Sequence, residues 1–213
     1  MIAEPVSLAT SDGTTLEALM TLPPTPRGAI VVCHPHPLYG GDMDNPVVVR
    51  AVEVCGDLRF ATLRFNFRGV GRSTGTHDNG RAEQNDVAAA LSHLRTAVGA
   101  TVPLALAGYS FGAAVVTTLV ATGDSPKDLA GVALIAPPLA MARETPWPAL
   151  ATFSRPVLVV AGDADHICPP TDLEAFARTV PNATVRTIPG ADHFFFGKLY
   201  PLGEIITTWA RTL

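Results

Sequence analysis

The sequence is poor in charged residues and has no strong excess of either sign. Only 16% of its 213 residues are charged, whereas 47% are hydrophobic, a balance that indicates a large buried interior with little charged surface. Fifteen basic and 19 acidic side chains leave a formal net charge of −4. This charge gives no electrostatic reason to bind nucleic acid or an anionic membrane, so we expect neither as a partner.

Cysteine is scarce, and long apolar runs are missing. The three cysteines, Cys33, Cys55 and Cys168, have no Cys-x-x-Cys spacing, and an odd number fits reduced, buried thiols better than a disulfide framework. No apolar run reaches the roughly 18 residues that a membrane span needs. The first residues, MIAEPVSLATSDG, lack the apolar core of a signal peptide. We therefore expect a soluble, cytoplasmic protein.

A series of short apolar runs is present instead. Four of them lack polar alternation, as strands do when helices cover both faces of a parallel sheet. The four are AIVVC (29–33), LALAG (104–108), GVALIA (131–136) and VLVVAG (157–162). Further strands are expected at 61–67 and 183–189, and the first twenty-odd residues form an expected hairpin.

Helix candidates lie between these runs and after them. Their ranges are 47–58, 82–98, 112–123, 171–180 and 200–213. A hairpin followed by alternating strands and helices predicts an α/β fold, with a doubly wound, mostly parallel sheet in a single domain over 1–213. The segment 137–156 contains five prolines and lies where many enzymes of this architecture insert a cap. Because it is short, we expect minimal or no cap.

A glycine-flanked serine follows one of the predicted strands. Residues 108–112 read Gly-Tyr-Ser-Phe-Gly, the Gly-x-Ser-x-Gly pattern in which the serine lies on a strained turn between a strand and a helix. A serine nucleophile needs a base to take its proton and an acid to orient that base. Asp165 and His193 follow two later strands, in the order Ser, acid, His. All three come just after strand ends, where open α/β sheets place their ligand crevice.

Two further motifs, CHPHPLYGGDMDNPVV (33–48) and LRFNFRGVGRSTG (63–75), extend the pattern. With them the sequence resembles the α/β-hydrolase fold over nearly the whole chain, and within it a group of small, nearly lidless hydrolases. The resemblance implies Ser110 as nucleophile, His193 as base and Asp165 as acid. Asp163 and Asp192 remain alternative acids. Asp192 is the weaker of these, because neighbours in an extended loop point away from each other.

An oxyanion formed on the substrate needs two hydrogen-bond donors. The backbone N–H of Phe111, directly after the serine, is one candidate. The second is expected from HPHPLYGG, where the prolines have no N–H; Leu38 is slightly favoured, and His36 and Tyr39 are the alternatives. We expect the substrate pocket to be lined by Tyr39, Tyr109 and Trp147. The aromatic run 194–196 is expected to pack inside the protein.

Two loops admit other interpretations. His34 and His36 near Asp42 have the spacing of zinc ligands, but no further ligand stands at a familiar distance, so we expect no metal and no cofactor. The glycine-containing loop 65–73 lacks the Gly-Lys-Ser/Thr of a phosphate-binding loop. Its Arg68 is expected to hold the loop in place by pairing with Glu83 or Asp86.

These features together predict an enzyme, a serine hydrolase that cleaves small carboxylic esters or thioesters through an acyl-enzyme on Ser110. Its partner would be a small-molecule ester or thioester substrate. Fold and triad do not fix the leaving group, so a peptidase or amidase on the same triad is an alternative. A non-catalytic binding or scaffold protein with the same fold is the second alternative.

Overall fold

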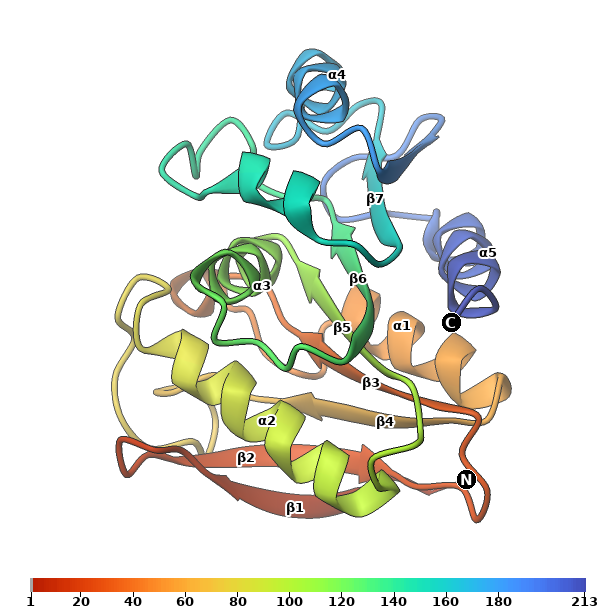
Figure 1. Ribbon diagram of the computed structural model, residues 1–213. Helices are drawn as coiled ribbons and strands as arrows, with labels where there is room; N and C mark the ends of the chain where they lie inside the picture. The colour runs from red at the N-terminus through yellow and green to blue at the C-terminus, as the bar shows by residue number, and fades with distance from the viewer. Residues whose placement is uncertain (1) are drawn as a thin grey trace.

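A twisted, mostly parallel sheet runs through the computed structural model, which describes residues 2–213 (Figure 1). The strands in these residues are β1 (Glu4–Ala9), β2 (Thr15–Thr21), β3 (Gly28–Cys33), β4 (Phe60–Phe65), β5 (Leu104–Tyr109), β6 (Leu129–Ile135), β7 (Val157–Gly162) and β8 (Ala183–Ile188). They pair in the order β1-β2-β4-β3-β5-β6-β7-β8. The β1–β2 and β2–β4 pairings are antiparallel, and the other five pairings in the described chain are parallel. The expected doubly wound sheet with an antiparallel hairpin is confirmed.

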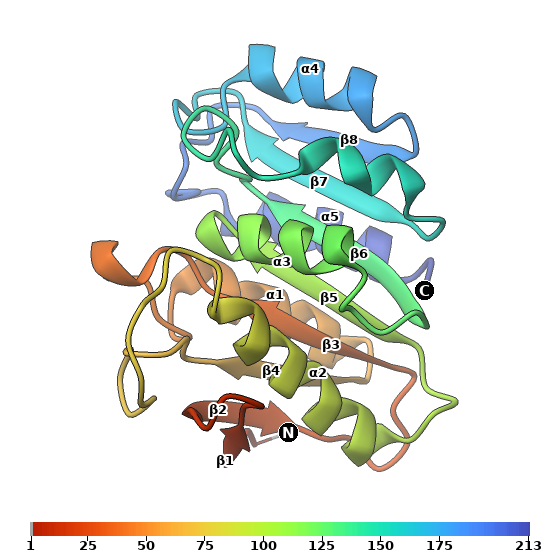
Figure 2. The same cartoon turned by 60° about the vertical axis from the view of Figure 1, so that its left-hand side comes forward.

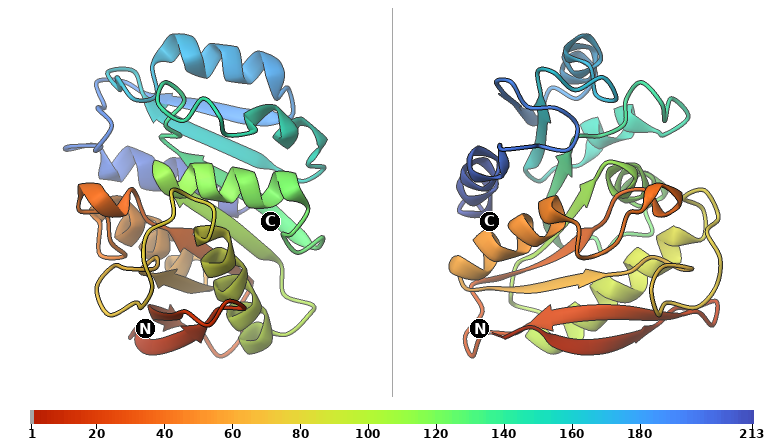
Figure 3. Two further views of the ribbon diagram at one scale, coloured as in Figure 1. Left: turned by 90° about the vertical axis from the view of Figure 1, so that its left-hand side faces the viewer. Right: turned by 180° about the vertical axis from the view of Figure 1, so that it is seen from behind.

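Helices cover both faces of this sheet. On one face lie α1 (Pro46–Asp57) and α5 (Leu199–Ala210), and on the other lie α2 (Glu83–Val98), α3 (Phe111–Thr122) and α4 (Pro170–Thr179) (Figure 3). Every residue of β3, β5 and β7 is buried as a result. Strands with two covered faces need apolar side chains at consecutive positions, which explains the uninterrupted apolar runs.

Successive side chains of each central strand point alternately into two separate hydrophobic cores. In β3, Val31 and Cys33 point into the core beneath α2 and α3, whereas Ile30 and Val32 point into the core beneath α1 and α5. This alternation follows from the pleat of a strand, which sends neighbouring side chains to opposite faces. All three cysteines are buried and free of disulfide bonds, as expected.

The proline-rich segment 137–156 does not form a separate domain over the sheet. It contains a short 3-10 helix, η2 (Trp147–Thr152), that packs on α3 and α4. No separate cap domain lies over the sheet in the described residues, so the expectation of minimal or no cap is confirmed. A separate observation concerns membranes: over residues 2–213, none of the helices combines the length and apolarity needed to cross one.

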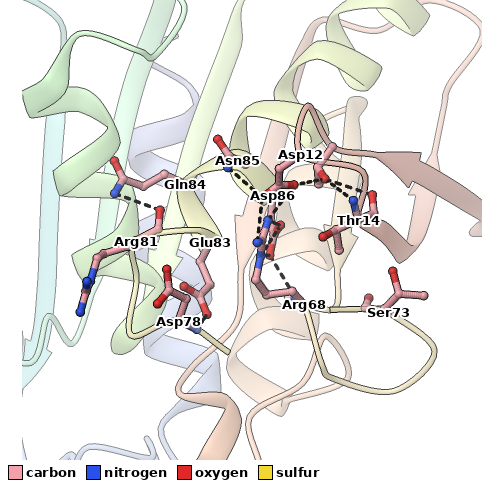
Figure 4. Close-up of polar contacts among 12 residues, drawn as sticks. Asp12, Thr14, Arg68, Ser73, Asp78, Arg81, Glu83, Gln84, Asn85 and Asp86 are labelled. Carbon is pink, nitrogen blue, oxygen red and sulfur yellow. Dashed lines mark hydrogen bonds and ion pairs between the residues drawn. The ribbon is translucent and has the colours of Figure 1, made fainter. Parts of the chain in front are cut away.

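The loop after β4 is held by a buried ion pair (Figure 4). The Arg68 guanidinium donates to both carboxylate oxygens of Asp86, with Nη2 and Oδ1 2.7 Å apart, and its Nη1 lies 2.9 Å from Oδ2 of Asp12. Asp86 belongs to α2 and Asp12 to the β1–β2 turn, so one side chain joins three elements. Of the two expected partners, Asp86 is the one that Arg68 contacts.

We predict that Asp86→Ala lowers the free energy of unfolding by about 3–5 kcal/mol, because it leaves the buried Arg68 guanidinium without its main partner. Asp44→Ala is the matched control. Asp44 pairs with Arg64 but its side chain is 67% exposed, and removing such an exposed pair costs at most about 1 kcal/mol. Urea unfolding of both variants measures the difference, and equal losses would contradict the prediction.

Candidate active site

Ser110 lies on a strained turn between β5 and α3. Its backbone has φ 52° and ψ −117°, a conformation that non-glycine residues rarely adopt and that costs on the order of 1–3 kcal/mol. Small neighbours make the turn possible. A Cβ at Gly112 would lie 2.6 Å from the carbonyl oxygen of Cys33, so a side chain at this position would separate α3 from the end of β3.

The structure brings Ser110 together with His193 and Asp165. The Ser110 Oγ lies 2.9 Å from Nε2 of His193, and Nδ1 of the same ring lies 2.8 Å from Oδ2 of Asp165. The three residues come from the loops after β5, β8 and β7, at the edge where the parallel strands end (Figure 2). All three side chains are buried or nearly so. A hydroxyl, an imidazole and a carboxylate thus form one hydrogen-bonded chain.

Asp165 is held in its ionised form by its surroundings. Burial by itself would raise the pKa of this carboxyl, but hydrogen bonds from His193 and from the N–H groups of Cys168 and Ile167 outweigh burial and place the pKa below its usual value. Both N–H groups donate to Oδ1, which leaves Oδ2 for the imidazole. An ionised carboxylate at this position favours the tautomer with a proton on Nδ1 of His193.

The two alternative acids bind backbone groups instead. Asp163 accepts a hydrogen bond from the N–H of Gly190 at 2.6 Å. Asp192 accepts from the N–H groups of Phe194 and Phe196, both at 3.1 Å. Both carboxylates therefore stabilise the loop that carries the histidine, while the imidazole bonds to a third aspartate.

The three residues expected to line a pocket lie in different environments. Tyr109 is buried at the end of β5, and its hydroxyl donates to the carbonyl of His193 at 2.9 Å. This hydrogen bond joins β5 to the loop that carries the histidine. Trp147 is also buried and packs against Phe176, away from the contacts of Ser110. Tyr39 is 80% exposed on the turn after β3. Of the three, Tyr39 alone is open to solvent.

The turn after β3 contains the short 3-10 helix η1 (Pro37–Tyr39). The N–H of Leu38 donates to Nδ1 of His36 at 3.2 Å, so this donor already has a partner. Within residues 2–213, the N–H groups of His36 and Phe111 have no acceptor. These two residues also touch, with ring centroids 4.8 Å apart. The N–H groups of His36 and Phe111 are therefore candidate donors for a ligand bound at Ser110.

His34 anchors this turn to the body of the protein. Its Nε2 accepts the N–H of Phe67 at 2.9 Å, and its Nδ1 lies 2.6 Å from the carbonyl oxygen of Pro35. Both ring nitrogens are thus occupied within the chain. In the part of the chain that the structure describes, no three His, Cys, Asp or Glu side chains gather as a possible metal-binding group.

The aromatic run after the histidine is only partly buried, and the expectation that it packs inside is wrong for two of its members. Phe195 is fully buried, but Phe194 is 61% and Phe196 80% exposed. The backbone of Phe195 has φ 54°, which turns this one ring inward and leaves its neighbours outward. Phe194 and Phe196 are thus exposed, as are Leu38 and Tyr39 on the turn after β3. Large apolar side chains therefore lie on the loops around Ser110.

A sheet of this order, with a serine on the turn after β5 and a histidine and an aspartate from later loops beside it, defines an α/β hydrolase. The chain belongs to the α/β-hydrolase domain family, whose model matches residues 28–199. It is 32% identical to an α/β serine hydrolase without lid from Xanthomonas campestris, with a TM-score of 0.84 over 99% of this chain and 94% of that one.

Two further relatives show comparable similarity. A serine hydrolase homologue from Coxiella burnetii is 32% identical, with a TM-score of 0.83, 98% of this chain covered and 97% of that one. An uncharacterised protein of Rickettsia prowazekii is 33% identical over 189 residues, which is 86% of this chain and 78% of the relative. The likeness thus extends over most of the chain in each case.

We predict that His34 stays neutral well below the pH at which free histidine titrates. Burial penalises its imidazolium and lowers its pKa to about 4, although the bond to the Pro35 carbonyl opposes this effect. The unfolded chain takes up this proton near pH 6.5. The stability contributed by neutral His34 is therefore complete above about pH 6.5 and declines as the pH falls toward 4.

An NMR titration of the imidazole Cε1–H signals measures this pKa. The His34→Phe variant assigns the resonance by its disappearance. A midpoint above pH 6 for that signal would show that the imidazole is not desolvated as the structure indicates.

Proposed function

We propose that the protein is a serine hydrolase that cleaves small carboxylic esters or thioesters through an acyl-enzyme on Ser110. The observation that carries the proposal is the hydrogen-bonded chain from Ser110 through His193 to Asp165. A hydroxyl becomes a nucleophile when a positioned base takes its proton, and a base keeps the right tautomer when a carboxylate orients it. Membership of the α/β-hydrolase family supports the same reaction class.

The proposed reaction has two halves. In the first, the Oγ of Ser110 attacks the substrate carbonyl carbon while Nε2 of His193 takes the hydroxyl proton. The tetrahedral intermediate then expels the alcohol or thiol, which receives that proton from His193. In the second half, His193 takes a proton from water as the water attacks the acyl-enzyme. The bond between the acyl carbon and Oγ of Ser110 then breaks, His193 returns the proton to Oγ, and the acid leaves. Asp165 stays ionised throughout and stabilises the imidazolium.

The oxyanion formed in both halves needs two donors, and we assign them to the N–H groups of His36 and Phe111. Both are free of other partners in the described residues, whereas the N–H of Leu38 is bonded to the imidazole of His36. Donors that are fixed before the reaction stabilise developing charge without reorganising. The assignment replaces the slight preference for Leu38 that the sequence alone suggested.

The surroundings of the site support an uncharged substrate with an apolar part. Exposed apolar side chains at Leu38, Tyr39, Phe194 and Phe196 lie on the loops around Ser110, and such groups favour contact with apolar substrate atoms. Esters and thioesters have better leaving groups than amides, so we place them ahead of a peptidase or amidase activity. A scaffold without catalysis would not require the ordered chain of hydroxyl, imidazole and carboxylate.

We predict that a fluorophosphonate probe labels Ser110 stoichiometrically, because the probe reacts with serines that a neighbouring base activates. Intact mass and peptide mapping locate the adduct. Ser110→Ala should lose the adduct and nearly all hydrolysis of p-nitrophenyl esters, retaining at most about 10³-fold catalysis over water from the oxyanion donors and binding. Folded wild-type protein that forms no adduct would favour the scaffold alternative.

We predict that Asp165→Asn lowers kcat by about 10⁴-fold, because the amide no longer stabilises the tautomer and the imidazolium that the reaction needs. Asp163→Asn and Asp192→Asn are matched controls, since an asparagine oxygen still accepts the backbone N–H bonds that these carboxylates make. Both controls should keep activity within about threefold of wild type. Strong loss in Asp163→Asn with an active Asp165→Asn would move the acid to Asp163.

A further inference from the structure

One histidine near the site has a largely buried side chain and no role in the proposed reaction. The side chain of His77 is only 9% exposed, and its Nδ1 lies 2.9 Å from Oε1 of Glu83. Neither ring nitrogen makes a hydrogen bond of good geometry within the described residues. Buried polar groups are nearly always hydrogen-bonded, so an imidazole kept in this state needs an explanation.

The ring of His77 packs against both residues that we assign as oxyanion donors. Its centroid lies 4.9 Å from that of His36 and 5.4 Å from that of Phe111. The rings of His36 and Phe111 in turn lie 4.8 Å apart. The three rings therefore form one cluster. His36 and Phe111 are the proposed donors, and His77 comes from a different part of the chain, the loop before α2.

The turn that carries His36 is bonded mainly to itself. The N–H groups of Leu38, Tyr39, Gly40 and Gly41 all donate to acceptors in residues 36 and 37. These bonds fix the shape of the turn but not its position relative to Ser110. Packing of the His36 ring against its neighbours, together with the anchor at His34, must fix that position.

Little else supports the turn on this side. A cavity of about 510 Å³ lies between the turn and the loop after β4, and it is lined by Pro37, Leu38, Gly69, Thr76 and His77 among others. The turn therefore has room to move toward that loop once the His77 ring is removed. A shift of about 1 Å at a reacting centre can cost on the order of 100-fold in rate.

Glu83 holds the segment that carries His77. Its carboxylate is fully buried in the first turn of α2 and accepts the N–H groups of Asp78 and Gly80, each at 2.8 Å. Figure 4 shows Glu83 beside Asp78, near the Arg68–Asp86 pair that fixes the start of the same helix. A carboxylate at a helix N-terminus is also favoured by the helix dipole.

We propose that His77, held by Glu83, is a positioning residue for the oxyanion-binding turn. Its ring keeps His36 against Phe111, so that the two free N–H groups point to the same place. This inference rests on the proposed function, because it concerns the oxyanion of the proposed reaction. Loss of the ring weakens binding of the transition state more than binding of the substrate, so the effect falls on kcat.

The test compares His77→Ala with His77→Phe, which keeps a flat ring but not the nitrogens, using a p-nitrophenyl ester as substrate. His77→Ala should lower kcat by about 10- to 100-fold with KM within about threefold of wild type. His77→Phe should recover kcat to within about threefold. The control His93→Ala, on the same helix as Glu83 but remote from the turn, should match wild type.

A second measurement separates positioning from a general loss of structure. A trifluoromethyl ketone forms a tetrahedral adduct that needs the oxyanion donors, so its inhibition constant should rise in His77→Ala by the factor that kcat falls. The inhibition constant of the product acid, which forms no such adduct, should stay within about threefold. Thermal unfolding checks that each variant is folded, and His77→Asn replaces His77→Ala if the latter does not fold.

Two results would overturn the proposal. One is an unchanged kcat in the folded variant without the ring. The other is an equal loss in His77→Phe and His77→Ala, which would show that ring packing is not the cause. Failure of the proposed function is distinguishable, because the wild-type protein would then lack the Ser110 adduct and esterase activity whatever residue stands at position 77.

Discussion

The first turn of α3 lies directly against the end of β3, and the geometry of the site depends on this close approach. A side chain at Gly112 would collide with the carbonyl groups of Cys33 and His34. Because glycine is there, the chain can turn sharply at Ser110 and bring the free N–H of Phe111 beside the turn that carries His36. The strain at Ser110 is sustained by the buried strand and helix on either side, which leave the turn no room to relax.

A second close approach brings the acid and the base together. A Cβ on Gly162, at the end of β7, would collide with the backbone of Ala191 in the loop after β8. The two loops are also joined by a hydrogen bond from the N–H of Ala164 to the carbonyl of Ala191 at 3.0 Å. Tyr109 adds a bond from β5 to the carbonyl of His193. Loops from distant parts of the sequence are thus positioned by contacts that do not involve the side chains of Ser110, Asp165 or His193.

Much of this arrangement is predictable from the sequence, because strands that are buried on both faces, such as β3 and β7, appear as uninterrupted runs of apolar residues. The order of Ser110, Asp165 and His193 after strand ends also predicts that they meet, although their roles in a reaction stay a prediction. The proposed choice of His36 over Leu38 as an oxyanion donor is not predictable in this way. It depends on the side chain of His36, which folds back to accept the N–H of Leu38. The exposure of Phe194 likewise follows from the positive φ of its neighbour Phe195, which no local sequence pattern predicts.

The hydrogen-bonding pattern around the site indicates where negative charge is expected to form. The carboxylates of Asp163, Asp165 and Asp192 are all bound to backbone N–H groups, Asp163 to one in the loop after β8 and the other two to groups of their own loops. In the described chain, the N–H groups of His36 and Phe111 remain without acceptors, and the rings of these two residues lie against each other. Donors left without a partner are unusual in folded proteins, so the proposed function explains this pair by an acceptor that is present only during the reaction. An oxyanion on a substrate attacked by the serine is such an acceptor, which links the packing of the turn to the chemistry proposed for the site.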